Sequence, residues 1–258
     1  MTNIVWRNIS NSEYENLWER FPTLRATANV CPTCNDNEKY VFEGEEHICD
    51  CDVQRGLRRH YLYANIGIRY HSLSFDDLYE EKDDLRLFLE EYIENFDSNA
   101  RYGRGVTFYG PLGTGKTFAQ ILILKSLIKE GYKAWFDSFT NVVTQYSEVD
   151  SKKYLMNNVR SAEIFALDEV IEPMSSRQHE YFSEVYESVI RYRVENSLPT
   201  LIGTNLDTEQ HEKWYPRVWS LLNMVQIPIQ VSGSDVRASQ AKDIVDMLIT
   251  NKEVRPIR

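Results

Sequence analysis

Residues 110–117 read Gly-Pro-Leu-Gly-Thr-Gly-Lys-Thr, a complete G-x4-G-K-T pattern. An apolar run at residues 106–109 precedes it, and residues 116–130 follow with the periodicity of a helix. This is the arrangement of a phosphate-binding loop, in which glycines turn backbone N–H groups toward phosphates and a helix adds the positive end of its dipole. The residues expected to contact a nucleotide are Gly110, Pro111, Leu112, Gly113, Thr114, Gly115, Lys116, Thr117 and Phe118.

Two side chains of the loop have expected roles. Lys116 should reach the β- and γ-phosphates, and the hydroxyl of Thr117 should bind Mg²⁺. The nucleotide that these groups suit is a triphosphate, so the sequence predicts an ATP site that works with magnesium.

Outward from the loop, predicted strands and helices alternate along the chain. The strands are expected at residues 106–109, 133–137, 163–168 and 199–203, and the helices at 82–96, 116–130, 139–160 (in pieces) and 176–196. Strands that alternate with helices predict the α/β class, with a parallel sheet covered by helices on both faces.

Polar residues at the ends of two of these strands complete the predicted site. Asp168 and Glu169 end the third strand, and Asn205 follows the fourth. The carboxyl ends of parallel strands meet at one edge of the sheet, so these side chains should lie beside the phosphate loop. We expect Asp168 to bind Mg²⁺, Glu169 to orient the attacking water, and Asn205 to bridge Glu169, the water and the γ-phosphate. These roles predict ATP hydrolysis.

All four cysteines of the chain fall in a short segment before the first of these strands. Cys31 and Cys34 form a C-x2-C pair and Cys49 and Cys51 a C-x-C pair, which together supply four thiolates for a closed, structural Zn²⁺ site. His47 lies close enough in sequence to replace Cys49 or Cys51 as a ligand, and free or disulfide-bonded thiols are a third alternative.

The cysteines suggest a division of the chain near residue 70. Residues 1–70 are expected to form an N-terminal zinc-binding module with a linker helix at about 53–64, and residues 71–258 an ATPase domain. A basic and aromatic cluster on that helix would either contact single-stranded DNA weakly and locally or be a solvated helix face. The cluster consists of Arg55, Arg58, Arg59, His60, Tyr61 and Tyr63.

Composition narrows the class of protein further. Of the 258 residues 42% are hydrophobic, which is ordinary for a globular protein, and the net charge of -10 argues against general coating of DNA. The chain shows neither an apolar run long enough for a bilayer nor a secretory leader in its first residues, so we expect a cytoplasmic protein without membrane contact.

The phosphate loop, the acidic pair and the strand-terminal Thr204-Asn205 resemble the AAA+ ATPases, specifically the DnaC/DnaI/IstB family of helicase loaders and transposition helpers. The resemblance covers about residues 60–240. It includes the segment at 64–75, which is similar to the one that introduces the ATPase core in loaders, and the segment at 216–222.

This resemblance implies an AAA+ P-loop core and two further site residues. Arg217 is similar to the arginine finger that completes the ATP site of a neighbouring subunit, which implies a homo-oligomer, and Arg237 is similar to the second sensor that reads the γ-phosphate in cis. The chain departs from the family at Leu221, where many relatives have a second arginine, and at Phe118-Ala119, where many have His-Leu.

The function implied is that of an ATP-dependent helicase loader in DNA replication. Its zinc module would dock on a hexameric replicative helicase, and the ATPase part would help place that helicase on single-stranded DNA. The alternatives are an IstB-like transposition helper that assembles on duplex DNA with a transposase, and an adaptor that binds ATP without turnover.

Overall fold

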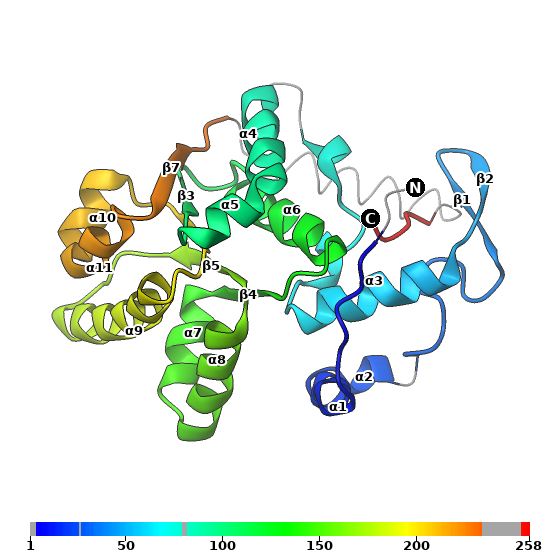
Figure 1. The fold of residues 1–258 in the computed structure, drawn as a ribbon, viewed down its shortest axis with the longest axis horizontal. Helices are drawn as coiled ribbons and strands as arrows, with labels where there is room; N and C mark the ends of the chain where they lie inside the picture. Colours follow the sequence, from blue (N-terminus) through cyan, green and yellow to red (C-terminus); the bar gives the residue numbers. More distant parts are fainter. Residues whose placement is uncertain (1–3, 26, 79–81, 234–253) are drawn as a thin grey trace.

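The computed structural model describes residues 4–25, 27–78, 82–233 and 254–258 (Figure 1). Its first part holds two helices, α1 (Asn11–Arg20) and α2 (Pro22–Arg25), then a hairpin of β1 (Lys39–Phe42) and β2 (Glu45–Ile48), and then α3 (Cys51–Tyr63). Two short 3-10 turns, η1 (Ile68–Tyr70) and η2 (Phe75–Asp77), lead to the second part.

A five-stranded sheet forms the centre of the second part. Its strands are β3 (Gly105–Tyr109), β4 (Ala134–Ser138), β5 (Ile164–Val170), β6 (Thr200–Thr204) and β7 (Gln226–Gln230). They are parallel throughout and lie in the order β4-β5-β6-β3-β7. The predicted α/β class with a parallel sheet is confirmed, and β7 is an additional strand that the sequence did not indicate.

Helices cover both faces of this sheet. One layer contains α3, α4 (Asp83–Glu94), α5 (Phe96–Arg101) and α6 (Lys116–Lys129), and the other contains α7 (Phe139–Tyr146), α8 (Val149–Ser161), α9 (Ser176–Glu195), α10 (Thr208–Trp214) and α11 (Pro216–Leu222) (Figure 1). Strand residues alternate between the two cores: Ile164 and Ala166 of β5 face the α6 layer, whereas Phe165 and Leu167 face the α9 layer. Among the helices that the structure describes, none is both long and apolar enough to cross a membrane.

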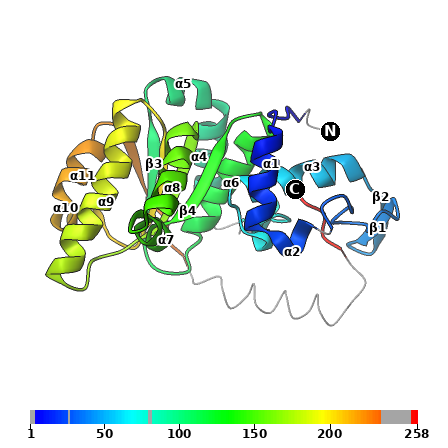
Figure 2. The ribbon, with the colours of Figure 1, turned by 90° about the horizontal axis from the view of Figure 1, so that it is seen from below.

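The β1–β2 hairpin lies at the end of the molecule away from α9 to α11 (Figure 2). Its turn is made by Glu43 (φ 52°) and Gly44 (φ 76°), and two successive residues with positive φ suit the twist of a two-residue hairpin. The sequence analysis did not predict this hairpin, which separates the two cysteine pairs.

Helix α3 packs against α6 across the predicted domain boundary. Leu57 and Tyr61 of α3 belong to the same buried cluster as the apolar residues of α6. The carbonyl of Ala64, just after α3, accepts a 2.9 Å hydrogen bond from the backbone N–H of Phe136 in β4. The division at residue 70 therefore stays a prediction, and it runs through a continuous core.

Candidate functional site

The phosphate loop has the backbone that its glycines were expected to allow. Gly110, Gly113 and Gly115 have φ values of 144°, 76° and 97°, in the region that residues with a side chain rarely adopt. A Cβ on Gly110 would also lie 2.3 Å from the carbonyl oxygen of Val231. The loop joins the end of β3 directly to the first residue of α6, so the N-terminus of that helix faces the loop.

Lys116 begins α6 and extends into the loop. Its ammonium donates hydrogen bonds to the carbonyl oxygens of Gly110 (2.7 Å) and Pro111 (2.6 Å), and the side chain is 9% exposed. A positive charge is thus held inside the loop, at the place where an anionic phosphate chain would need it.

A second lysine, Lys82, contacts the same loop. It was not identified from the sequence. The ammonium of Lys82 donates to the carbonyl oxygen of Thr114, and the Lys82 side chain is buried. Because the C=O and N–H of a trans peptide point in opposite directions, a donor on the Thr114 carbonyl directs the N–H of Gly115 to the other side. Lys82 belongs to none of the motifs, so only the tertiary structure reveals its position.

Asp168 lies at the carboxyl end of β5, beside the first turn of α6. Its carboxylate accepts a 2.6 Å hydrogen bond from the hydroxyl of Thr117 and a 3.4 Å hydrogen bond from the side-chain amide of Gln120. Burial raises the pKa of the Asp168 carboxyl, while the hydrogen bond from Thr117 acts in the opposite direction. The predicted magnesium ligands Thr117 and Asp168 are therefore neighbours, with a carboxylate and a hydroxyl side by side.

The absence of a side chain at Gly203 makes room for this carboxylate. A Cβ on Gly203, in the neighbouring strand β6, would lie 2.1 Å from Oδ1 of Asp168 and 2.3 Å from the amide nitrogen of Gln120. Neither Gln120 nor Gly203 was predicted as a site residue. The sequence does show a glutamine one turn after the loop threonine and a glycine inside an apolar strand, but it does not show that both lie against Asp168.

Glu169 and Asn205 lie at the same edge of the sheet. Glu169 has a φ of 57° and sits where the register between β5 and β6 shifts, so the strand turns at this residue and its side chain is exposed. Asn205 follows the last residue of β6 and is also exposed. Because β6 lies between β5 and β3, both residues come from strands near the phosphate loop. Their catalytic roles stay predictions.

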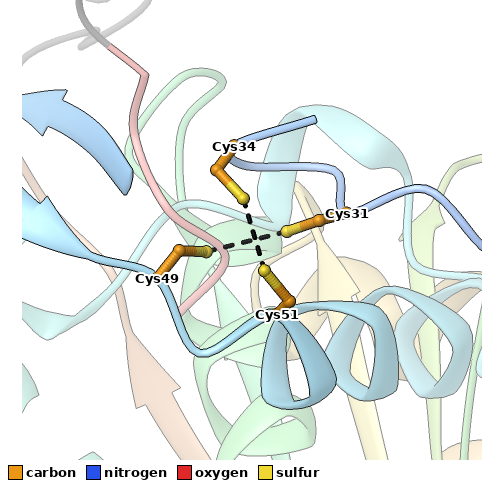
Figure 3. A group of neighbouring side chains, drawn as sticks. All are labelled: Cys31, Cys34, Cys49 and Cys51. Atoms are coloured by element: carbon orange, nitrogen blue, oxygen red, sulfur yellow. Dashed lines mark hydrogen bonds between the residues drawn. The ribbon is translucent and has the colours of Figure 1, made fainter. Parts of the chain in front are cut away.

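The four cysteine sulfurs form a compact cluster (Figure 3). Cys31 and Cys34 come from the turn after α2, Cys49 follows β2, and Cys51 is the first residue of α3. All four sulfur atoms lie within 4.8 Å of one another, with Cys31 to Cys49 at 3.6 Å and Cys34 to Cys51 at 3.3 Å. Four converging sulfurs have the donor set and spacing of a closed metal site, and the cluster could hold a metal ion.

The surroundings of the cluster bear on which residues would be ligands. The ring of His47 stacks on Tyr40, and its Nε2 lies 3.3 Å from the carbonyl oxygen of Phe42, with which it forms a hydrogen bond. Burial opposes ionisation of these thiols, but hydrogen bonds from the other three cysteines lower the pKa of Cys34 to about 7, whereas the pKa values of Cys49 and Cys51 are raised. The geometry favours the set of four cysteines over the mixed set with His47.

Comparison with known proteins finds similar folds. No family model matches the chain. A stretch of 124 residues is 23% identical to the replicative helicase loader DnaI of Bacillus subtilis (strain 168), and it covers 46% of this chain and 39% of DnaI. The crystal structure of the DnaC helicase loader superposes with a TM-score of 0.57 at 20% identity, covering 64% of this chain and 100% of that structure. The chain has the fold of the DnaC/DnaI-type AAA+ loaders.

A second solved structure agrees with this assignment. The crystal structure of DnaI gives a TM-score of 0.55 at 19% identity and covers 66% of this chain and 94% of that structure. The resemblance to DnaC/DnaI-type AAA+ proteins inferred from the sequence is thus confirmed for the fold. The sequence match itself spans less than half the length of DnaI.

In this DnaC/DnaI-type fold, Arg217 lies on α11, in the helix layer across the sheet from α6 (Figure 1). Its side chain is 82% exposed, with one guanidinium nitrogen 3.6 Å from a carboxylate oxygen of Glu187 on α9. Leu221, which replaces the second arginine of many relatives, packs instead against the core of that layer. Arg237, the predicted second sensor, lies outside the described residues.

The basic cluster on α3 makes contacts within the protein. Arg55 forms ion pairs with Asp36 (3.0 Å) and Asp52 (2.8 Å), and Arg58 donates to the carbonyl of Thr27. Tyr61 is fully buried. The contact with single-stranded DNA stays a prediction, and these internal bonds favour a structural role for the cluster.

Proposed function

We propose that this protein is an ATP-dependent loader of a hexameric replicative DNA helicase, which it helps place on single-stranded DNA during replication. The observation that carries the proposal is the pairing of Thr117 with Asp168 beside an intact phosphate loop, in a fold shared with DnaC and DnaI. The sequence similarity to DnaI supports the choice of a loader among proteins with this fold.

The residues around the loop fit a Mg-nucleotide. Backbone N–H groups of the loop, the start of α6 and the ammonium of Lys116 suit a chain of phosphates. The Thr117 hydroxyl and the Asp168 carboxylate are oxygen donors of the kind that Mg²⁺ prefers. When bound, the metal would supply positive charge that neutralises the phosphate oxygens. Lys116 would exchange its two loop carbonyls for phosphate oxygens, so the loop opens around the ligand.

Two exposed side chains at the sheet edge would then act on water. Glu169 would accept a hydrogen bond from a water molecule and orient it, and it would take up a proton as hydrolysis proceeds. Asn205, from the neighbouring strand, would hold the same water with its side-chain amide. The reaction proposed is hydrolysis of ATP to ADP and phosphate.

We further propose that the active form is a homo-oligomer. Arg217 lies in the opposite helix layer from α6 and is exposed, as expected for a guanidinium that reaches the ATP site of a neighbouring subunit. Its partner Glu187 would hold the side chain in place before assembly. Arg237 would read the nucleotide within its own subunit.

The cysteine cluster is proposed to hold one structural Zn²⁺ and to shape the helicase-docking module. The four sulfurs fit a tetrahedral thiolate set, which leaves no open position for a substrate. A small module gains stability from such a metal because its own core is limited. Loading would take place in the cytoplasm, where the helicase and DNA meet.

The test is complex formation with the replicative helicase of the same host, measured by size-exclusion chromatography with light scattering, with and without ATP. We expect a stoichiometric complex, and we expect Glu169→Gln to keep ATP binding while phosphate release stops. A protein that forms no complex but assembles on duplex DNA with ATP would be a transposition helper instead. A wild-type protein that binds ATP without releasing phosphate would be an adaptor.

A further inference from the structure

Residues 254–258, with the sequence Val-Arg-Pro-Ile-Arg and here called the tail segment, lie against the first part of the chain (Figures 1 and 2). They occupy the space between β1, α3 and the linker at residues 71–77, close to the cysteine cluster. More than two hundred residues separate Ile257 from its partner Gln54 along the chain, so this contact is made only in the folded protein.

The backbone of the tail segment is bonded on both sides. The N–H of Val254 donates to the carbonyl of Val41 in β1 (2.9 Å), and the N–H of Arg258 donates to the carbonyl of His71 in the linker (3.1 Å). The hydroxyl of Tyr61 in α3 donates to the carbonyl of Arg258 (2.9 Å). An extended peptide is recognised in this way when its backbone groups meet fixed partners.

The side-chain amide of Gln54, on α3, forms two hydrogen bonds with one residue of the tail segment. Its Oε1 accepts from the N–H of Ile257 (2.8 Å), and its Nε2 donates to the carbonyl of the same residue (3.1 Å). The Gln54 side chain is 9% exposed, so these bonds are sheltered from water.

The two arginines of the tail segment form ion pairs, and its two apolar residues between them are buried. The guanidinium of Arg255 pairs with Asp77 at 2.6 Å, and that of Arg258 pairs with Asp76 at 2.9 Å. Arg258 also lies over the ring of Phe42, with its guanidinium carbon 5.3 Å from the ring centre. The residues between the two arginines, Pro256 and Ile257, are buried. The residues that contact the tail segment, here together called the groove, therefore suit a peptide with two basic residues around an apolar pair.

A hydrogen bond connects this groove to the cysteine cluster. The hydroxyl of Thr33 donates to Oε1 of Gln54 at 2.6 Å, which is the same oxygen that accepts from Ile257. Thr33 lies between Cys31 and Cys34 and is 3% exposed. The position of Gln54 thus depends on the turn that carries two of the four sulfurs.

On its other side, the groove is fixed to the helix that starts at the phosphate loop. The His71 carbonyl that accepts from Arg258 also accepts from the ammonium of Lys125 (2.7 Å), in the middle of α6. Lys125 donates to the carbonyl of Tyr70 as well (2.9 Å). The tail segment therefore bonds to the cysteine module and to the linker at the same time.

We propose that this groove is a peptide-binding site whose ligand is the chain's own tail segment. In the bound state, here called the closed form, the tail segment ties the cysteine module to the linker at residues 71–77, in addition to the packing of α3 on α6. The site does not require that the protein load a helicase. Metal binding at the cysteines favours the closed form because it holds Thr33, and through it Gln54, in place. By reciprocity, the bound tail segment strengthens metal binding. This second half rests on the proposed zinc site.

Hydrogen exchange measured by mass spectrometry on the full-length protein tests the proposal. The N–H groups of Val254, Ile257 and Arg258 should be protected in the wild type. In Gln54→Leu, which removes both amide bonds, the peptide covering the tail segment should exchange about tenfold faster. Zinc affinity, measured by equilibrium competition with a colour-forming chelator, should fall in the same variant.

Exchanging the charges of one ion pair controls for a variant that loses protection only because it fails to fold. Asp77→Arg should loosen the tail segment by placing two guanidinium groups together, and adding Arg255→Asp should restore protection. The matched control is Glu46→Gln, which breaks the exposed ion pair with Lys39 on the same hairpin and should change nothing in the tail segment.

Each other outcome overturns a stated part of the proposal. Fast exchange of the tail segment in the wild type, or no restoration in the double variant, would overturn the peptide site. Protection that falls on dilution would show that the ligand comes from a second molecule. If the purified protein carries no metal, the zinc site and the coupling to it fail, while the exchange results still decide whether the groove binds the tail segment.

Discussion

The hydroxyl of Thr117, in the first turn of α6, donates a 2.6 Å hydrogen bond to the carboxylate of Asp168 at the end of β5. This bond joins the phosphate loop to the neighbouring acidic strand end, at the place proposed above for a magnesium ion. When the Thr117 hydroxyl rotates so that its proton points away from Asp168, both oxygens are available to a cation.

The first prediction concerns that bond. Thr117→Val keeps the shape of the side chain but removes the hydroxyl, so Mg²⁺ should no longer strengthen ATP binding and phosphate release should fall about a hundredfold. The measurement is ATP affinity by fluorescence titration, with and without magnesium. Thr144→Val, which removes an exposed hydroxyl bonded within α7, serves as the control and should behave as wild type. An unchanged magnesium effect in Thr117→Val would contradict the assignment.

Gly203 provides the second prediction. An added methyl group would meet the Asp168 carboxylate and the Gln120 amide at distances that force both to move. Gly203→Ala should therefore lower the free energy of unfolding by about 1–3 kcal/mol and abolish phosphate release. Chemical denaturation and an ATPase assay measure the two effects. Gly67→Ala, whose methyl group would meet only the Tyr70 ring at ordinary contact distance, should have little effect on either.

The third prediction distinguishes the possible metal ligands. The purified protein should contain about one zinc ion per chain, and Cys31→Ser or Cys49→Ser should lose most of it. His47→Ala should keep its zinc, because the His47 ring is bonded to the Phe42 carbonyl in the hairpin. Metal analysis on the same chromatographic fractions gives the stoichiometry. Loss of zinc from His47→Ala alone would favour the mixed set of ligands.

Two buried histidines give a fourth prediction, on stability and pH. Burial lowers the pKa of His71 and of His211 to about 4, whereas in the unfolded chain their pKa is about 6.5. As the pH falls below about 6.5, the unfolded chain binds protons that the folded protein does not, so stability is lost toward acid. The free energy of unfolding should fall by up to about 1.4 kcal/mol per pH unit for each histidine.

Urea denaturation between about pH 6.5 and pH 5 measures this slope, above the range where most carboxylates titrate. In His211→Leu the slope should be shallower, since one of the groups that bind protons more readily in the unfolded chain is gone. His60, whose pKa is also lowered by burial, remains in the variant. A slope that is the same in the variant would show that His211 does not take part.

The fifth prediction concerns Arg217. Arg217→Ala should bind ATP normally and lose phosphate release, because the side chain is exposed on α11 and would act on another subunit. Mixing it with Lys116→Ala, which should not bind ATP, should partly restore activity, since each variant supplies what the other lacks. No restoration at any mixing ratio would mean that the finger is another residue or that the protein acts alone.

Much of the sheet and its helices could be predicted because local sequence and tertiary structure agree there. The strand at 106–109, the glycine loop and the helix from Lys116 carry both periodicity and turn chemistry, and all three are confirmed. The edge strand β7 could not be predicted in the same way. Its sequence, Gln-Ile-Pro-Ile-Gln, contains Pro228, and a proline within a short run argues against a strand unless the strand is at an edge.

The candidate site was predictable to a similar extent. Thr117, Asp168 and the four cysteines could be named because fixed spacings carry their chemistry, and the structure brings each set together. Lys82 contacts the phosphate loop from another part of the chain. Position 203 requires glycine because the Asp168 carboxylate and the Gln120 amide occupy the space that a side chain would need. No local pattern encodes such contacts, so they become visible only in three dimensions.

The hydrogen bonds of Lys125 determine at which residue a separate ATPase fragment can begin. Its ammonium is buried in α6 and donates to the carbonyls of Tyr70, His71 and Leu73, and it lies 5.1 Å from the centre of the Tyr61 ring. Burial lowers the pKa of Lys125 to about 6. A fragment cut at residue 71 would lose the Tyr70 carbonyl and the ring, and would leave this buried amine short of hydrogen-bond partners beside the apolar core. A well-behaved ATPase fragment should therefore start before α3.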